Sequence, residues 1–449
     1  ELRVVDEEYV LDYEVTNASK QYDASVLMNC TGGNDFLRVS NEFDIEEILP
    51  ARTKRAGKLT LKVIKNPLEE MEISIICEIK GNAVEKTEIN ENDIAGGIEE
   101  KDEPMLEAGS DTKTFFGHEF DRSKVEKITF IEDKAVPDNA MEAWDASGSQ
   151  DGSIMVYTLD ENQNDLYELY IGKDKAPFIA NPDSSSLFEG FTNLISIVDL
   201  EKLDTSQAIN MSRMFYNCGK LKEFNLSNFN TENVTDMSSM FDMGGSGSNS
   251  SAITSLDLNS FDTSKVTNMN RMFYTCRELK TLNLGHFNTG NVTDMSFMFS
   301  RCHSLTSLNI SNFDTNNVTD MNNMFSWVES LITLDLNHFN TSNVTDMNSM
   351  FRYCVNLKTL KISNFDTSNV TNMSCMFYQS YAVITTINIR GTKCTNWRLM
   401  FHVAATSSTA QITVNYTADA SSLVDGMIGT KYNGTDSPSK VKKGGIITF

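Results

Sequence analysis

The chain has 449 residues, which is too long for one hydrophobic core, so at least two domains are expected. Its formal net charge is -24, and the excess lies in residues 1–180, which carry 40 acidic and 19 basic side chains. Phosphate recognition requires a basic surface, so a nucleic-acid partner is not expected. No stretch of about 18 apolar residues is present, and membrane insertion is not expected either.

Residues 1–90 alternate apolar and polar side chains in short runs, such as 59–64 and 73–79, and turn residues separate these runs. The pattern predicts an antiparallel β-sandwich of immunoglobulin-like size. Cys30 and Cys77 both fall in this region and are the better disulfide candidates of the chain. Residues 91–111 are acidic and lack periodicity, which predicts a linker.

From residue 187 to residue 416 the sequence repeats. The dipeptide Met-Phe recurs eight times, in steps of 26 residues except for one of 32 and one of 24. A degenerate copy, Leu187-Phe188, precedes these and brings the number of coils to nine. The Gly/Ser-rich run from Gly244 to Ser251 lies in the longer step and predicts a surface loop. A fixed period of this length predicts a leucine-rich-repeat solenoid.

Each coil of this predicted solenoid contains two apolar patterns. Leu305, Leu308 and Ile310 have the L-x-x-L-x-L spacing of a short parallel strand. The second pattern places four apolar side chains on one face and predicts a short helix, for which Thr293 is the expected N-cap. In the same coil these side chains are Val292, Met295, Met298 and Phe299. Stacked coils would bury both patterns in one continuous core.

The two ends of a solenoid need caps, because each end coil otherwise exposes its apolar face. Residues 112–186 are the predicted N-terminal cap, and their strand-like segments 127–131 and 153–157 are expected to pair onto the first coil. At the other end, residues 412–416 predict the last strand, and residues 417–449 are the predicted C-terminal cap.

Two residue types recur at fixed positions of the repeat. Cysteines stand three residues after the repeat phenylalanine in four coils, which favours small buried residues with free thiols over catalytic ones. They are Cys218, Cys276, Cys302 and Cys354. Asn-Val-Thr triplets are either glycosylation acceptors or side chains that bond the backbone coil after coil, and their fixed position favours the second interpretation. They begin at Asn233, Asn291, Asn317, Asn343 and Asn369.

The units formed by residues 311–315 (Ser-Asn-Phe-Asp-Thr), 318–321 (Val-Thr-Asp-Met) and 324–325 (Met-Phe) resemble those of the BspA-type leucine-rich-repeat surface proteins of bacteria. The resemblance covers roughly residues 112–416. It implies a secreted or surface-displayed bacterial protein with a role in adhesion. Because the chain opens at Glu1 instead of Met, we expect that a signal peptide has been removed.

The predicted binding surface is the outward face of the short strands, because alternate strand residues point away from the core. Two columns of polar residues follow from the repeat, and Trp327, present in one coil only, is a second candidate. The columns are Thr281, Ser307, Thr333 and Thr359, and Asn283, Asn309, Asp335 and Lys361.

Two functions are left open by these patterns. The first is an adhesin-like protein that presents the solenoid to a protein ligand, and the second is a glycan-binding or spacer module whose recognition lies in the N-terminal β-sandwich. No catalytic residues, metal site or cofactor are predicted, and an enzyme is not expected. His286 and His338 share one repeat column but lie two coils apart, about 10 Å by strand spacing, which is too far to share a metal ion.

Overall fold

The computed structural model of the chain describes residues 105–107, 114–244 and 251–448, together with the backbone of six strands in residues 8–84. The chain divides into two compact units, Glu1–Glu100 and Lys101–Phe449. Within the described residues, no helix has both the length and the apolar character needed to cross a membrane.

The first unit contains two antiparallel three-stranded sheets, with strand orders β1-β5-β3 and β4-β2-β6. These sheets agree with the alternating pattern of the sequence, whereas their packing as an immunoglobulin-like sandwich stays a prediction. The register of β2 with β6 sets Cys30 opposite Cys77, as a disulfide between them would require. The strands are β1 (Glu8–Thr16), β2 (Asp23–Gly32), β3 (Leu37–Asn41), β4 (Glu47–Leu49), β5 (Lys54–Val63) and β6 (Ile75–Val84).

The second unit begins with a five-stranded sheet of order β10-β11-β12-β9-β14. Strand β9 (Val125–Ile131) runs parallel to β14 (Ser196–Val198), which also bridges to the next coil at Glu223. The predicted pairing of residues 127–131 with the first coil is therefore confirmed. The same prediction for residues 153–157 was wrong, because this segment pairs with β10 and β12 inside the cap. The remaining strands here are β7 (Thr114–Phe115), β8 (His118–Glu119), β10 (Glu142–Asp145), β11 (Ile154–Leu159), β12 (Tyr167–Lys173), β13 (Phe178–Ile179) and β15 (Leu203–Asp204).

Three residues that the sequence placed in the linker belong to this cap. Met105 bridges to Ile179, and Leu106 bridges to Ser147 with its side chain buried. A linker assigned up to residue 111 was therefore too long. The apolar pair Met105-Leu106 has its partners in the cap, which the acidic composition around it does not reveal.

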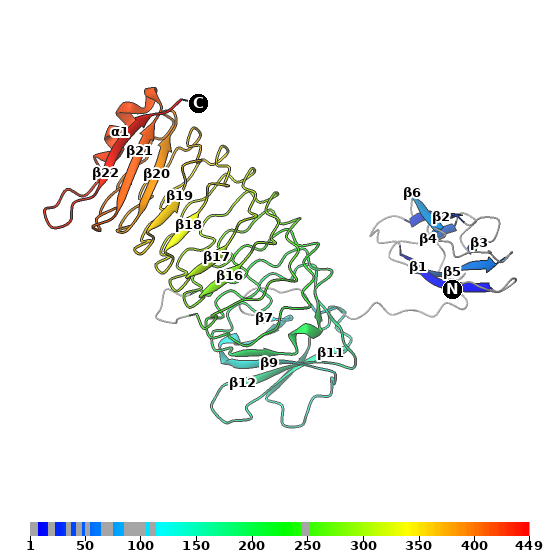
Figure 1. The fold of residues 1–449 in the computed structure, drawn as a ribbon. Coiled ribbons are helices and arrows are strands. Elements are labelled where there is room, and N and C mark those ends of the chain that lie inside the picture. The colour runs from blue at the N-terminus through cyan, green and yellow to red at the C-terminus, as the bar shows by residue number, and fades with distance from the viewer. Residues whose placement is uncertain are drawn as a thin grey trace. The chain divides into compact units, whose positions relative to one another are not determined.

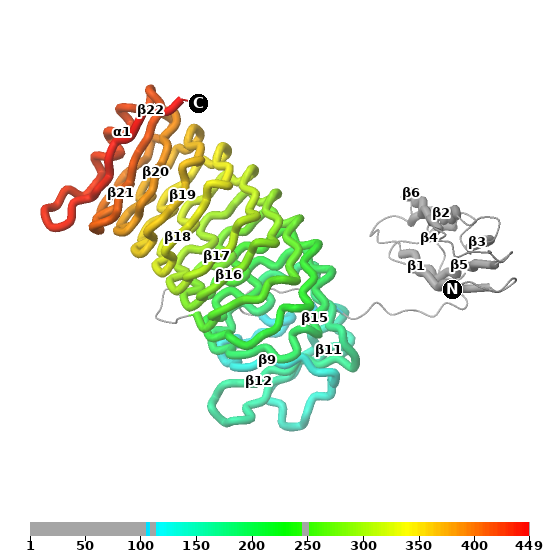
Figure 2. The backbone as a smooth tube through the Cα atoms, viewed as in Figure 1, coloured from blue at the N-terminus to red at the C-terminus, as the bar shows by residue number. Residues whose placement is uncertain are grey.

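Figure 1 and Figure 2 show the rest of the second unit as successive coils that lie side by side between this cap and the C-terminal strands. Parallel bridges link one position of every coil from Asp183 to Asn396. The strands of the coils are short, and the assignment of these coils to the leucine-rich-repeat class stays a prediction. They are β16 (Thr281–Asn283), β17 (Ser307–Asn309), β18 (Thr333–Asp335) and β19 (Thr359–Lys361).

The repeat phenylalanines form one stack through the core of the second unit. Nine buried rings, from Phe188 to Phe401, follow one another with centroids 5.4–5.8 Å apart. Phe188 is the first of them and stacks on Phe215, so the degenerate copy in the sequence is a true coil. Because each ring between the two ends has an aromatic neighbour above and below, no inner coil completes its core alone.

The segment predicted to be helical is a series of turns. In residues 295–302 the backbone N–H groups of Met298, Ser300 and Cys302 donate to carbonyls three residues earlier. Every second N–H instead donates to the next coil. These pairs are Met295 to Asp320, Phe297 to Asn322, Phe299 to Met324 and Arg301 to Ser326, at 2.8–3.1 Å.

The prediction of a short helix in each coil was therefore wrong. An α-helix keeps its N–H groups for carbonyls of the same segment, whereas here half of them bond the neighbouring coil. Two residues of this segment also have positive φ, Phe297 at 57° and Arg301 at 65°, which interrupts any right-handed helix. The apolar spacing was correct, because turns of this kind also bring Met295, Met298 and Phe299 to the core.

Two columns of threonine join neighbouring coils. Thr293, expected as an N-cap, is exposed, and its hydroxyl donates to the carbonyl of Thr267 on the preceding coil at 3.3 Å. The other column is buried, and each of its hydroxyls donates to a carbonyl of the next coil at 2.8–3.1 Å. This column comprises Thr205, Thr231, Thr263, Thr289, Thr315, Thr341 and Thr367.

The recurring asparagines and cysteines also hold the backbone of neighbouring coils. The side-chain amide of each triplet asparagine donates to a carbonyl of the preceding coil at 2.7–3.0 Å, which confirms the structural interpretation. The thiols of Cys218, Cys276, Cys302 and Cys354 are buried and free, and each lies 2.8–3.2 Å from a backbone carbonyl oxygen of the preceding coil. Burial raises the pKa of these thiols, so they remain protonated.

The C-terminal end adds longer strands and the only α-helix among the described residues. The predicted last strand, residues 412–416, lies in β21 (Gln411–Tyr416), but β22 (Val441–Ile446) pairs in parallel outside it. The remaining elements are β20 (Ile384–Ile389), α1 (Ser421–Ile428) and three single-turn 3₁₀ helices at Arg122–Lys124, Leu200–Lys202 and Ala418–Ala420.

The two threonine columns predict that a Thr→Val substitution lowers the free energy of unfolding by different amounts at two positions of the same coil. Thr341 is buried, donates to the carbonyl of Asp366 at 2.9 Å and accepts its N–H at 2.7 Å. Thr341→Val should lower the free energy of unfolding by about 1–3 kcal/mol, because the half-buried N–H and carbonyl of Asp366 lose their partner. Thr345→Val, at an exposed hydroxyl, should cost less than about 0.5 kcal/mol. Urea denaturation of both variants measures the difference, and equal losses would contradict it.

Candidate functional site

The two predicted polar columns lie on the outward face of the short strands. Thr281 pairs with Ser307 and Thr333 with Thr359, while Asn283 pairs with Asn309 and Asp335 with Lys361. All eight side chains are exposed. The structure thus brings them together in pairs, in the register that the repeat predicts, within two separate sheets.

The second column bonds along its own length. The amide of Asn309 donates to Asn283 at 2.8 Å, and the ammonium of Lys361 lies 2.7 Å from the carboxylate of Asp335. This hydrogen bond from Lys361 lowers the pKa of Asp335. Exposed ion pairs contribute little energy, and a partner here would have to displace bonds already made. The second column of the strand face is therefore polar and paired within itself.

Trp327, the remaining predicted residue, does not lie on the strand face. It follows Phe325 by two residues, in the turns that carry the repeat phenylalanines. Its N–H donates to the carbonyl of Arg352 on the next coil at 2.7 Å, and the N–H of Tyr353 donates likewise to Tyr378 at 2.9 Å. These bonds hold side chains of the same column over one another.

A continuous series of rings and guanidinium groups results, which we name the arginine–aromatic edge. Its side chains are half-buried except Tyr432, which is 38% exposed and comes from the C-terminal cap. The edge consists of Arg271, Tyr274, Arg301, His303, Trp327, Arg352, Tyr353, Tyr378, His402 and Tyr432.

The rings of this edge contact one another in sequence. Trp327 and Tyr353 are stacked with centroids 3.8 Å apart, and His303 lies 5.9 Å from Trp327 on the preceding coil. Tyr378 meets Tyr353 edge-on at 5.6 Å and stacks on His402 at 5.2 Å. Since the faces of Trp327 and Tyr353 cover each other, the edge offers its partners ring edges, hydroxyls and N–H groups more than open ring faces.

The arginines lie against these rings. The guanidinium carbon of Arg352 is 5.2 Å from the ring centroids of both Tyr353 and Tyr378. Arg271 and Arg301 both lie near the ring of Tyr274, at 5.1 and 5.9 Å. Cation–π contact holds a guanidinium in place without neutralising its charge.

Two titratable groups at this edge have shifted pKa values. His303 contacts the carboxylate of Glu329 at 3.2 Å, but its burial outweighs that carboxylate and lowers its pKa, which favours the neutral imidazole. Asp242 occupies the column of Tyr274 and is buried; burial raises its pKa to about 6, although the N–H of Gly244, the hydroxyl of Thr275 and the charge of Arg271 act in the opposite direction. The loop residues 245–250 that follow lie outside the described residues.

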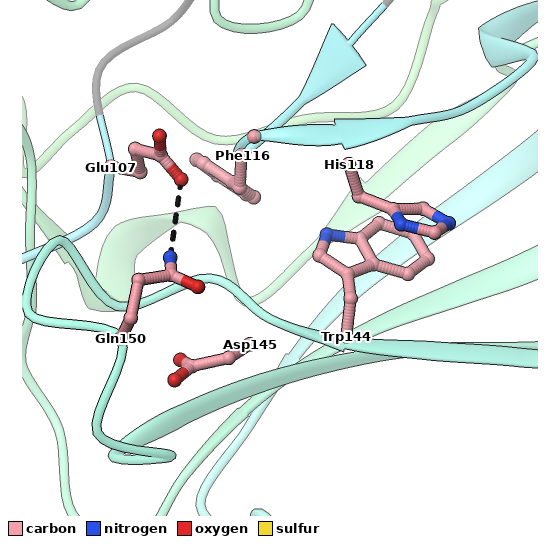
Figure 3. A pocket seen from close by; sticks show the side chains of 7 residues that line it. Glu107, Phe116, His118, Trp144, Asp145 and Gln150 are labelled. Atoms are coloured by element: carbon pink, nitrogen blue, oxygen red, sulfur yellow. Dashed lines mark hydrogen bonds between the residues drawn. The ribbon is translucent and has the colours of Figure 1, made fainter.

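A separate pocket of about 260 Å³ lies in the N-terminal cap (Figure 3). Several of its polar groups already have partners: Gln150 donates to Glu107 at 3.3 Å, and the ring of His118, which stacks on Trp144 at 4.7 Å, lies 3.4 Å from the carboxylate of Glu142. The indole N–H of Trp144 is buried and has no partner among the described residues. One donor among mutually paired groups gives no catalytic arrangement, and we assign these residues to the structure of the cap.

No group of three or more potential ligands within the described ranges is arranged to hold a metal ion. His286 and His338, the two histidines of one column, each contact a backbone carbonyl instead, those of Leu258 at 2.9 Å and Ile310 at 3.0 Å.

Most of the arginine–aromatic edge was missed from the sequence, although a signal was present. Tyr353 and Trp327 both stand two residues after a repeat phenylalanine, and Arg352, Tyr378 and His402 stand one residue after. A comparison of these columns across coils would have found them, whereas Trp327 taken alone looks like an isolated residue. Tyr432 lies outside the repeat and carries no such signal.

The raised pKa of Asp242 makes stability depend on pH. The folded protein keeps this proton over a range where the unfolded chain, with a pKa near 3.8, has lost it, so the free energy of unfolding falls between about pH 4 and about pH 6. The fall is on the order of 3 kcal/mol. Asp242→Asn should remove it, whereas Asp262→Asn, at an exposed carboxylate, should leave it in place. Urea denaturation from pH 4 to pH 8 checks this, and an unchanged slope in Asp242→Asn would refute it.

The coils are the part of the chain that matches a known protein family. The family model described as Mycoplasma protein of unknown function, DUF285, matches residues 182–308, 242–333 and 304–417, which together exceed half of the chain. No curated protein and no solved structure matches the chain. The matched residues run from the first bridged coil to the end of β21. The chain therefore belongs to the family of Mycoplasma proteins of unknown function named DUF285.

Proposed function

We propose that the protein is a surface-displayed, adhesin-like binding protein whose leucine-rich-repeat solenoid presents the arginine–aromatic edge to a protein partner. The observation that carries this proposal is the ladder of Trp327, Tyr353 and Tyr378 with Arg352 between the two tyrosines. Trp, Tyr and Arg are the residue types that contribute most energy at protein–protein interfaces. Here they are half-buried and packed against one another, and such packing reduces the entropy lost on binding.

The proposal of display at a bacterial surface is supported by the resemblance of the repeats to BspA-type proteins and by membership of a bacterial repeat family. The same support favours recognition, because a repeated scaffold offers a long surface to a partner.

A glycan partner is less well supported for this surface. A saccharide ring docks its apolar face on an open aromatic face, but Trp327 and Tyr353 cover each other at 3.8 Å. The strand face has exposed threonines and asparagines without aromatic residues in its two columns. Recognition within residues 1–90 stays the alternative, and their side chains lie outside the described residues.

The test compares two faces of the same full-length chain. Immobilised fibronectin and fibrinogen and a glycan array are the probes, and biolayer interferometry measures the affinity for the proteins. Trp327→Ala/Tyr353→Ala should weaken protein binding at least about 30-fold, the effect of losing about 2 kcal/mol at an interface centre. Thr333→Ala/Thr359→Ala, on the strand face of the same two coils, should change it less than about threefold.

Thermal denaturation of both variants checks that the coils remain folded. Binding that depends on the threonines and not on the aromatic pair would contradict the proposal. Binding to glycans alone, with no loss in either variant, would favour recognition in residues 1–90.

A further inference from the structure

We infer that the partner bound at the arginine–aromatic edge is an acidic polypeptide segment, an inference that rests on the proposed function. The guanidinium groups of the edge lack carboxylate partners, and the edge is positive in a strongly acidic protein. The ring geometry also favours carboxylates over sugars.

The guanidinium groups of Arg271, Arg301 and Arg352 form no ion pair with any carboxylate of the described residues. Arg213, at the position of Arg271 in an earlier coil, does have such a partner in Glu189. The Nε atom of Arg352 is buried and has no hydrogen-bond acceptor in the part of the chain that the structure describes. The chain has 62 acidic residues, yet these arginines have no carboxylate as an ion-pair partner. An external anion could supply that partner.

The sign of charge along the edge is the reverse of that of the chain. Four positions of each coil are compared here. One stands two residues before the repeat phenylalanine, and the others stand one, two and four residues after it, in the coils from Phe273 to Phe401. These columns contain four arginines and one carboxylate, Glu329. The carboxylate oxygen of Glu329 lies 3.2 Å from the Nδ1 atom of His303. A strip of this sign on a protein of net charge -24 attracts anions locally and is confined to one side of the coils.

The rings add to this preference. Stacking turns the faces of Trp327 and Tyr353 toward each other, so the positive ring edges are more open to a partner than these two faces. The same side chains carry hydroxyl and indole N–H donors. All of these groups favour an acceptor with negative charge. Carboxylates on a flexible chain fit them better than a saccharide, which would need an open ring face.

The length of the edge suits a peptide. From Phe273 to Phe401 there are five steps of 5.6–5.8 Å between stacked rings, or roughly 28 Å. An extended polypeptide rises about 3.3 Å per residue, so about eight residues would cover the edge.

The experiment uses the full chain and a fluorescein-labelled deca-glutamate peptide, with deca-lysine and deca-serine peptides for comparison. Fluorescence anisotropy should show binding of deca-glutamate but not of deca-serine, while deca-lysine should bind the acidic surface of the chain with an affinity that Arg301→Gln/Arg352→Gln does not lower. The dissociation constant for deca-glutamate should rise at least about tenfold when NaCl is raised from about 0.01 M to about 0.15 M, since the Debye length then falls from about 30 Å to about 8 Å. The dissociation constant for deca-glutamate should also rise by at least about tenfold in the double variant Arg301→Gln/Arg352→Gln.

The matched control is Lys358→Gln/Lys361→Gln. It removes the same two positive charges from exposed side chains of the coil that contains Arg352, but at and beside the strand β19, and should leave the affinity within about threefold. Circular dichroism and the thermal midpoint verify that all variants are folded. Equal losses in the two double variants would overturn the inference, because charge anywhere on the coils would then suffice.

Failure of deca-glutamate to bind at low salt would also overturn it, and binding of heparin lost in Arg301→Gln/Arg352→Gln would then assign the edge to a sulfated polysaccharide. Neither result is the same as failure of the proposed function. Binding of fibronectin or fibrinogen that depends on Trp327 and Tyr353, but not on Arg301, Arg352 or salt, would keep that function and reject the acidic partner.

Discussion

Every second N–H group in the turns around the repeat phenylalanine bonds the next coil instead of its own, and the rest of the second unit depends on this arrangement. Phe297, Phe299 and Arg301 illustrate it, with N–H to carbonyl distances of 2.8–3.0 Å to the following coil. The phenylalanine rings then stack at 5.4–5.8 Å. A coil therefore cannot satisfy its backbone or its core in isolation, which makes stability a property of neighbouring pairs.

The same arrangement explains how a repeat scaffold acquires a distinct surface. Bonds between coils fix the columns, so a side chain at one repeat position always lies over its counterpart in the next coil. Where the columns contain threonine or asparagine, the side chains bond the backbone or each other. Where they contain tyrosine, tryptophan and arginine, as in the coils of Trp327 and Arg352, the outcome is a stacked and positively charged edge.

The sequence predicted correctly the features that recur in every coil. Its predictions were wrong or incomplete for features that depend on how neighbouring coils bond and pack. The nine phenylalanines, the free buried cysteines and the role of the triplet asparagines follow from fixed spacing. The short helix was wrong because spacing reports which residues face the core and does not report where each N–H group bonds. Left-handed residues such as Phe297 and Arg301 have no sequence signature, since in most coils they are not glycine. The strand columns were placed correctly, whereas the edge was reduced to Trp327 because its neighbours differ in residue type from coil to coil.

Hydrogen–deuterium exchange of the full chain, followed by mass spectrometry of peptides, tests most directly whether the coils hold one another. The segments 295–302, 321–328 and 347–354 each donate alternate N–H groups to the next coil. Their exchange should be slow and should accelerate together as denaturant is added, at the free energy of unfolding of the whole stack. If one of these middle segments exchanged as fast as a free peptide while its neighbours stayed protected, the coils would be independent and the account would be contradicted.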